Sequence, residues 1–284
     1  MRPLSILLPA GWAALFVAMP LLLVAAISLS QSRLGQPPFT PLFEAGRFMG
    51  SLENYSLLLS DPLYMDALLN SLLYAGTGTL LALAIGLCIA RAVAHAGPRW
   101  QLPLLALIIV PFWISFLIRI YAWILLLKPE GLINGALIGL GLIDTPLPLF
   151  NNGFAVVLGI TYAYLPFMIL PIHAALQDQP PALAEAAIDL GASPAKAFWL
   201  VTLPLAWPGI AAGCLLVFIP AMGEFIIPDL LGGSATPMLG QTLWNEFFLN
   251  RDWPLACALA VLLGLLLLLP ALLLQRGRAR GAPA

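Results

Sequence analysis

Six long apolar segments constrain the fold of this 284-residue chain more than any other feature. A helix needs about 20 apolar residues to cross the roughly 30 Å hydrocarbon core of a bilayer, and each segment is about that long. The segments cover approximately residues 6–29, 68–94, 102–127, 154–176, 207–227 and 255–274. The chain is 61% hydrophobic and only 9% charged, against about 25% charged residues in soluble domains. We therefore predict an all-α polytopic membrane protein with six transmembrane helices in one domain, and not a water-soluble globular domain.

The first segment resembles a signal peptide only in its basic start at Arg2. Its apolar core is longer than the roughly 7–15 residues of a cleaved signal, and no small-x-small cleavage site closes it. We predict a retained helix that remains embedded in the lipid bilayer.

Basic residues in the connecting loops predict the orientation, because cytoplasmic loops are enriched in Lys and Arg. With the N-terminus inside, the cytoplasmic side holds Arg2, Arg91, Arg99, Lys196, Arg276, Arg278 and Arg280. The outer side holds Arg33, Arg47, Lys128 and Arg251. Six spans place both termini in the cytoplasm. The outer loops are net acidic, which either reflects tolerance of acids outside or forms a vestibule that attracts a cationic solute.

The loop at 177–206, between the fourth and fifth segments, has more structure than a simple connection requires. Residues 182–190 are mostly strong helix formers, and Gly191 is suited to the left-handed conformation that ends a helix. Ser193 and Pro194 are typical of the N-cap and first position of a second helix. The sequence predicts two short helices that either dock into a partner at the cytoplasmic surface or merely connect two spans.

The spacing in this loop resembles the EAA loop of ABC importer permeases. The matching positions are Glu185, Ala186, Ala187, Gly191, Leu203 and Pro204, with Val201 where the family usually has Ile. In that family the loop is the coupling helix that fits a groove on a cytoplasmic ATPase. The resemblance implies that these residues bind an ABC ATPase dimer, and that ATP and Mg²⁺ bind to that partner and not to this chain.

Two charges lie within the predicted spans. Arg119 and Glu224 each fall 17 residues after the start of their segment (119 − 102 and 224 − 207), or roughly 25 Å along a helix. Charges in a membrane pair with one another or line a water-filled route. They therefore form a mutual ion pair, or Glu224 faces a translocation path and accepts the ammonium group of a cationic substrate. Pro220 and Gly223 are expected to loosen the fifth helix just before Glu224.

Further candidates for the path accompany these charges. Tyr121, Trp123 and Tyr164 are placed to make cation–π contacts with a substrate, or else belong to the interfacial aromatic belt. Asp229 is a weaker candidate for the same path.

Several segments resemble the permeases of spermidine/putrescine importers. They are Pro111 to Trp123, Gly131 to Asn134 and Phe218 to Gly233. The outer segments Asp61 to Tyr64 and Leu243 to Pro254 are similar to permeases of putrescine transporters in particular. The resemblance implies one of two homologous permease subunits in a bacterial inner membrane, with a type I ABC importer fold. It also implies delivery of the substrate by a periplasmic binding protein.

Other functions are less consistent with the sequence. An importer of another small solute stays open, and an ion-coupled secondary transporter leaves the 177–206 loop unexplained. Cys88, Cys214 and Cys257 have no metal-ligand spacing, and no catalytic constellation is found. We therefore predict a non-catalytic subunit with no cofactor of its own and no nucleic-acid partner. The four-residue spacing of small residues at Gly78, Ala82, Gly86 and Ala90 predicts a helix-packing face.

Overall fold

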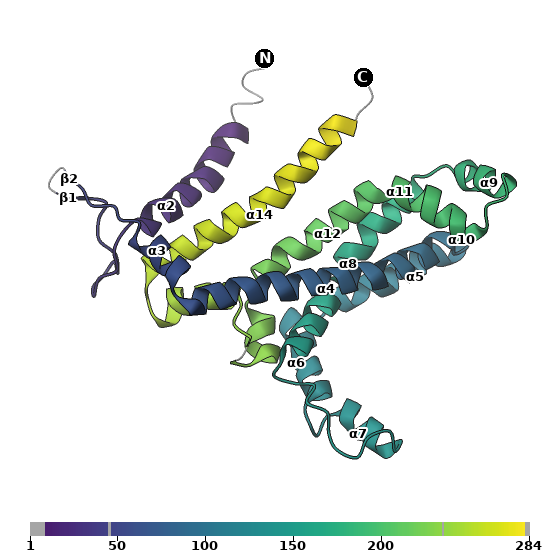
Figure 1. The fold of residues 1–284 in the computed structure, drawn as a ribbon, viewed down its shortest axis with the longest axis horizontal. Coiled ribbons are helices and arrows are strands. Elements are labelled where there is room, and N and C mark those ends of the chain that lie inside the picture. Colours follow the sequence, from purple (N-terminus) through teal and green to yellow (C-terminus); the bar gives the residue numbers. More distant parts are fainter. Residues whose placement is uncertain (1–8, 45–46, 235, 282–284) are drawn as a thin grey trace.

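The computed structural model describes residues 9–44, 47–234 and 236–281, and helices dominate it (Figure 1). The helical elements, in chain order, are η1 Ala14–Ala18, α2 Met19–Ser28, α3 Glu53–Ser60, α4 Pro62–His95, α5 Pro98–Ile109, η2 Val110–Trp113, α6 Phe116–Leu127, α7 Leu132–Gly139, α8 Gly153–Gln177, α9 Pro181–Asp189, α10 Pro194–Ala197, η3 Phe198–Thr202, α11 Leu203–Leu205, α12 Trp207–Met222, η4 Pro228–Gly232, α13 Leu239–Trp244, η5 Asn245–Leu249 and α14 Trp253–Gly281. The strands β1 Phe43–Glu44 and β2 Arg47–Phe48 form a short antiparallel hairpin. The prediction of an all-α fold is confirmed.

Helices α4, α8 and α12 form the packed centre of the molecule (Figure 1). The predicted small-residue face of α4 lies against α8: a Cβ on Gly78 would come 2.7 Å from Ile160 Cγ2, and one on Gly86 would come 2.8 Å from Met168 Cγ. Small residues allow such close approach, which favours helix association in a membrane where the hydrophobic effect between helices is absent. The interpretation of this face as a packing surface is correct.

The contact between α8 and α12 is closer still. A Cβ on Gly209 would lie 2.5 Å from the carbonyl oxygen of Pro171 and 2.4 Å from the Cβ of Ala175. Because the first of these is a backbone atom, the side chain of α8 cannot simply rotate away. Gly209 therefore sets the separation of the two helices.

We expect Gly209→Ala to destabilise the assembled protein by about 1–3 kcal/mol, the usual cost of overpacking. Thermal unfolding of the detergent-solubilised protein measures this effect. The matched control is Gly76→Ala in α4, where the added methyl group meets nothing within 4 Å. Equal melting temperatures for the two variants would contradict the packing argument.

Three described helices have the length and hydropathy of single membrane spans: Pro9–Ser28, Pro62–His95 and Gly153–Gln177. Two further candidates are bent pairs, formed by Pro98–Trp113 with Phe116–Gly139 and by Pro194–Leu205 with Trp207–Met222. Helix α14 covers the sixth expected segment. Its apolar part is described as far as Leu268. Residues 6–8 of the first expected segment lie outside the described residues.

The segment predicted as one helix over 102–127 is broken. Its two parts, Pro98–Trp113 and Phe116–Gly139, meet at 91°, and Ile114 and Ser115 between them have extended backbone conformations. Pro111 lacks the N–H that would continue the helical hydrogen-bond ladder, so the chain tightens into the 3-10 turn η2 before it turns away. The prediction of a continuous helix was wrong here.

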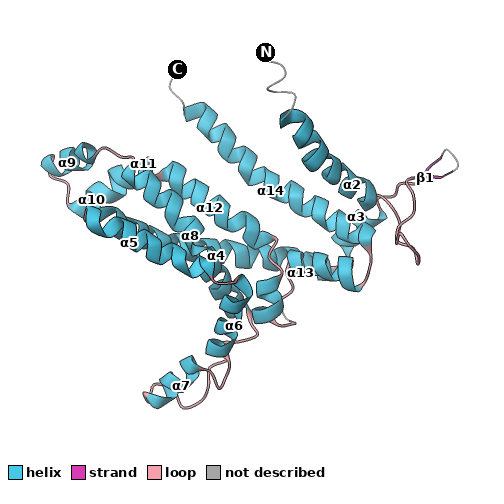
Figure 2. Cartoon of the chain, turned by 180° about the vertical axis from the view of Figure 1, so that it is seen from behind, coloured by secondary structure: helices cyan, strands magenta, loops and turns pink. Residues whose placement is uncertain are grey.

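The first and last helices lie side by side, apart from the central helices (Figures 1 and 2). Helix α2 contacts α14, and Asn54 of α3 donates hydrogen bonds to the carbonyl oxygens of Ser28 and Ser30 at the end of α2. The helix Pro9–Ser28 has 0% of its span window buried within the chain. Its apolar surface is therefore available to lipid or to another subunit.

Candidate coupling loop and membrane pocket

The loop between α8 and α12 folds as two short helices joined at a glycine, as predicted. Helix α9 ends at Asp189, and Gly191 follows with φ +91°. The amide of Ala192 donates to the carbonyl of Ala187 at 3.0 Å, and that of Gly191 donates to Ile188 at 2.8 Å. This is the glycine-dependent helix ending in which a left-handed residue lets the chain satisfy the last carbonyl groups.

The second helix of the loop starts at a side-chain cap. The hydroxyl of Ser193 accepts a 3.3 Å hydrogen bond from the amide of Lys196, and Pro194 takes the first helical position. The helix continues through α10, η3 and α11 to Leu205. It then bends by 67° into α12. The second helix of the loop is therefore joined to α12 through a single bend at Ala206.

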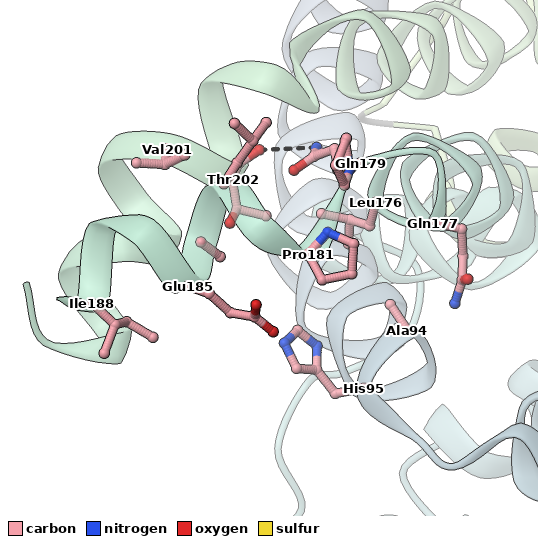
Figure 3. A pocket seen from close by; sticks show the side chains of 13 residues that line it. Ala94, His95, Leu176, Gln177, Gln179, Pro181, Glu185, Ile188, Val201 and Thr202 are labelled. Carbon is pink, nitrogen blue, oxygen red and sulfur yellow. Dashed lines mark hydrogen bonds between the residues drawn. The ribbon is translucent and has the colours of Figure 1, made fainter.

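Two contacts hold the loop against the membrane helices. The guanidinium carbon of Arg91, on α4, lies 3.9 Å from the ring centroid of the buried Phe198. The side-chain amide of Gln179 donates to the carbonyl oxygens of Ala175 and Thr202, which joins the end of α8 to the second helix of the loop (Figure 3). The loop is thus tied to two of the three central helices.

A cavity of about 350 Å³ lies between the loop and the ends of α4 and α8. Glu185 and Val201 line it from the loop, and His95 lines it from α4. The carboxylate of Glu185 points toward the imidazole of His95 (Figure 3). The Nδ1 atom of His95 lies 2.9 Å from the carbonyl oxygen of Arg91.

The outer side of the loop is apolar and solvent-exposed. Leu190, Trp199 and Leu200 have 90%, 57% and 65% of their surface exposed. Ala186, Gly191 and Pro204 are exposed, whereas Ala187, Val201 and Leu203 are half-buried. Large exposed apolar side chains beside small ones are typical of a surface that another protein covers.

The second site is a pocket of about 470 Å³ among α6, α8 and the segment after α12. Glu224, Arg119 and Tyr164 all line it. Helix α12 ends at Met222 and Gly223 follows as its C-cap, so Glu224 occupies a break in the helix. The predicted loosening of the fifth helix before Glu224 is therefore present in the structure.

Glu224 is buried, with 8% of its surface exposed, and both carboxylate oxygens are hydrogen-bonded. Oε1 accepts from the amides of Ile226 and Ile227, at 3.0 and 3.5 Å, and so caps the next helical turn. Oε2 accepts a hydrogen bond from the hydroxyl of Tyr164. No basic side chain of the described residues forms an ion pair with it.

Arg119 lies in the same pocket without reaching this carboxylate. It also has 8% of its surface exposed, and its guanidinium carbon lies 4.4 Å from the ring centroid of Phe112 and 5.6 Å from that of Phe116. Its Nε atom is buried and has no hydrogen-bond partner among the residues that the structure describes. Of the two alternatives left by the sequence, the mutual ion pair is not formed in this structure.

The remaining sequence-predicted path residues do not line this pocket. Tyr121 is 54% exposed. Trp123 packs edge-to-face on Tyr162, with ring centroids 5.5 Å apart. Asp229 is exposed, and its Oδ1 atom accepts a 3.2 Å hydrogen bond from the side-chain Nε2 of Gln241. Within the described residues, no group of three His, Cys, Asp or Glu side chains is placed to hold a metal ion.

Comparison with known proteins identifies the family. Residues 63–278 match the family described as the inner membrane component of binding-protein-dependent transport systems. The chain belongs to this family. The permease is 39% identical over 269 residues to the spermidine/putrescine transport system permease protein PotB of Haemophilus influenzae, a match that covers 95% of this chain and 90% of that protein. It is also 39% identical to PotB of Escherichia coli K12, over 91% of this chain and 92% of that protein.

A solved structure confirms the fold class. The permease superposes on a chain of a bacterial ABC transporter that imports alginate with a TM-score of 0.70, covering 98% of this chain and 95% of that chain. The sequence identity is 17%, so this likeness concerns the fold. The sequence comparisons confirm the prediction of an ABC importer permease of the polyamine type, and the superposition confirms the fold.

Sequence reasoning missed several residues of the two sites. Phe112, Phe116 and Phe167 line the membrane pocket of the permease, and Arg91 and His95 contact or face the loop. The spacing from Tyr164 to Phe167 is one helical turn, which places both on one side of α8 and was visible in the sequence. The contacts of Arg91 and His95 cross between distant segments, and no local pattern signals them.

Proposed function

We propose that this permease is one of two membrane subunits of an ATP-driven importer that moves polyamines, such as putrescine and spermidine, from the periplasm to the cytoplasm. Homologues named PotB, among them two that are each 39% identical over at least 91% of this chain, support the substrate class. One observation carries the proposal chemically: the buried carboxylate of Glu224, in an aromatic-lined pocket, forms no ion pair with any residue that the structure describes.

The hydrogen bonds of Glu224 leave room for a substrate ammonium. An ionised carboxylate has about four lone-pair sites. Two amides donate to Oε1, but only Tyr164 donates to Oε2. A primary ammonium group is therefore able to donate a further hydrogen bond to Oε2. The rings of Phe112, Phe116 and Phe167 supply apolar contacts for the methylene chain. Phe167, over which none of the described cations lies, supplies a cation–π contact for the charge, since Arg119 lies against the other two rings.

The loop at 177–206 is proposed to bind the cytoplasmic ATPase. Its exposed apolar residues provide the contact surface, and its bend into α12 provides the mechanical connection to the pocket, because Glu224 follows the end of that same helix. Closure of an ATPase dimer on ATP and Mg²⁺ would displace the loop and so move the segment that holds Glu224. A periplasmic binding protein would deliver the substrate to the opposite side.

We further propose six spans in the inner membrane with both termini in the cytoplasm. The loop bias in Lys and Arg supports this orientation, and the start of the helix Pro9–Ser28 lies on the same side of the structure as the end of α14 (Figure 1).

Uptake into proteoliposomes that contain the permease, its sister permease, the ATPase and the binding protein tests the proposal. We expect ATP-dependent accumulation of radiolabelled putrescine or spermidine, and no accumulation of an uncharged solute of similar size. Vesicles supplied with a non-hydrolysable ATP analogue serve as the control. Accumulation of the uncharged solute, or uptake that continues without ATP hydrolysis, would refute the proposed function.

A further inference from the structure

Arg119 is a buried cation whose charge is not balanced in this structure. Its Nε atom has no hydrogen-bond partner, and its guanidinium group contacts only aromatic faces among the described residues. It also lies in the first turn of α6, where the helix dipole is unfavourable to positive charge. Removing a cation from water without an anionic partner is costly, so an anion that came within reach of the guanidinium group would stabilise Arg119.

The available anion is Glu224, which lines the same pocket and has no ionic partner in the described part of the chain. Each charge follows a break in its helix: Arg119 comes four residues after Ser115, and Glu224 comes directly after Gly223. Helix α6 contacts both α8 and η4, the helical turn that follows Glu224. A change in either bend therefore changes the separation of the two charges.

We propose that Arg119 is an internal competitor of the transported cation for Glu224. The inference rests on the proposed function, in which Glu224 receives the substrate ammonium. In the state described here the guanidinium lies against Phe112, and the carboxylate is free to accept the substrate. When the pocket contracts, Arg119 moves onto Glu224, displaces the ammonium and leaves neither charge unpaired.

The aromatic rings make this exchange feasible. A guanidinium group stacks on an aromatic face and also pairs with a carboxylate, so Arg119 has a favourable contact in both positions. Its flexible side chain makes the transfer without unfolding α6. The exchange also allows the substrate to leave. A carboxylate that binds the substrate ammonium tightly would retain it unless another cation, here Arg119, took its place.

Distance measurements in the assembled importer test the exchange. Arg119 and Glu224 are both replaced by cysteine after removal of Cys88, Cys214 and Cys257, and a short bifunctional thiol reagent is applied. We expect the crosslinked fraction to differ by about fivefold or more between the nucleotide-free and the vanadate-trapped complex, the lower range of typical conformational coupling. The matched control pairs Glu224→Cys with Ile118→Cys, whose side chain is 62% exposed on the neighbouring position of α6. We expect no state-dependent crosslinking for this control.

A second variant tests the competition directly. Arg119→Met retains an apolar side chain against Phe112 but removes the charge. We expect the KM for putrescine uptake to fall about tenfold, with a lower maximal rate, because the competitor is lost and release slows. A substitution that only damages packing would lower the maximal uptake rate without lowering the KM.

The outcomes separate this inference from the proposed function. A crosslinked fraction that depends on nucleotide supports the exchange. Because the cysteine pair lacks Glu224, putrescine as the cargo is tested separately, by uptake into proteoliposomes that contain the unmodified permease. A nucleotide-dependent crosslink without putrescine uptake supports the exchange and rejects putrescine as the cargo, and the two results together support both. A crosslinked fraction equal in the two nucleotide states, or a KM for Arg119→Met that is unchanged or raised, overturns the role of Arg119.

Discussion

Replacing Gly191 with valine is expected to leave ATP hydrolysis in the assembled importer while substrate uptake falls about tenfold or more. Gly191 has φ +91°, a conformation that costs an L-residue on the order of 1–3 kcal/mol, and a β-branched residue is the least tolerant of it. An added Cβ meets no atom within 4 Å, so the effect comes from the backbone and not from crowding. The turn must open, and the second helix of the loop then loses its fixed angle to α9. Parallel assays of ATPase rate and putrescine uptake measure the ratio.

Two substitutions serve as controls for this prediction. Gly97→Val introduces the same side chain at a glycine with φ −57° and open space around it, and we expect nearly normal coupling. Gly191→Asn retains a residue that tolerates the left-handed region, and we expect partial coupling. If Gly191→Val transports as much substrate per ATP as the unmodified permease, the turn is not part of the coupling mechanism.

The structure of the 177–206 loop was predictable from sequence because each residue that shapes it acts on backbone groups only a few positions away. Gly191 ends a helix through its own backbone freedom, and Ser193 caps the next helix through an amide three residues away. The same reasoning holds for Gly223, where the fifth apolar segment breaks before Glu224. In each case the residue and the group that it controls lie within one helical turn.

The third apolar segment shows where such reasoning fails. Its hydropathy predicts one span, but hydropathy records composition and not backbone direction. Pro111 was visible in the sequence, yet prolines inside α8, at Pro166 and Pro171, leave that helix continuous. Whether a proline breaks a helix depends on the packing around it, and α8 is the most enclosed of the long helices, with 56% of its span window buried.

Whether the two charges in the pocket form an ion pair could not be predicted from the sequence either. The sequence placed Arg119 and Glu224 at similar depths and left open whether they pair. Their separation depends on the 91° bend before α6 and on the ring of Phe112 that receives the guanidinium. Both are tertiary features. Tyr121 lies two residues after Arg119 and so points to another side of α6 than the pocket-lining Phe116 and Arg119. Trp123 lies one turn beyond Arg119 on the same face, and it packs on Tyr162 outside the pocket.

Replacing Glu224 with glutamine is expected to reduce putrescine uptake by about 10- to 100-fold while the importer still assembles. The amide oxygen of glutamine is able to accept the hydrogen bonds that Oε1 now accepts from Ile226 and Ile227, so the helical cap is retained. What is lost is the negative charge, and a hydrogen bond to a charged group contributes about 1.5–3 kcal/mol, or roughly one to two factors of ten. Uptake in proteoliposomes measures transport, and co-purification of the subunits measures assembly.

Asp229→Asn is the matched control, because it removes a carboxylate only five residues away (229 − 224) that is exposed and outside the pocket. We expect uptake by this variant to stay within about twofold of normal, since exposed charges contribute little. Equal losses in the two variants would mean that the acidity of the whole region attracts the substrate, and that Glu224 is not a specific ligand. A Glu224→Gln complex that fails to assemble but is restored by Arg119→Met would instead assign the pair a structural role. The three results therefore distinguish a binding carboxylate, a diffuse field and a structural ion pair at the same position.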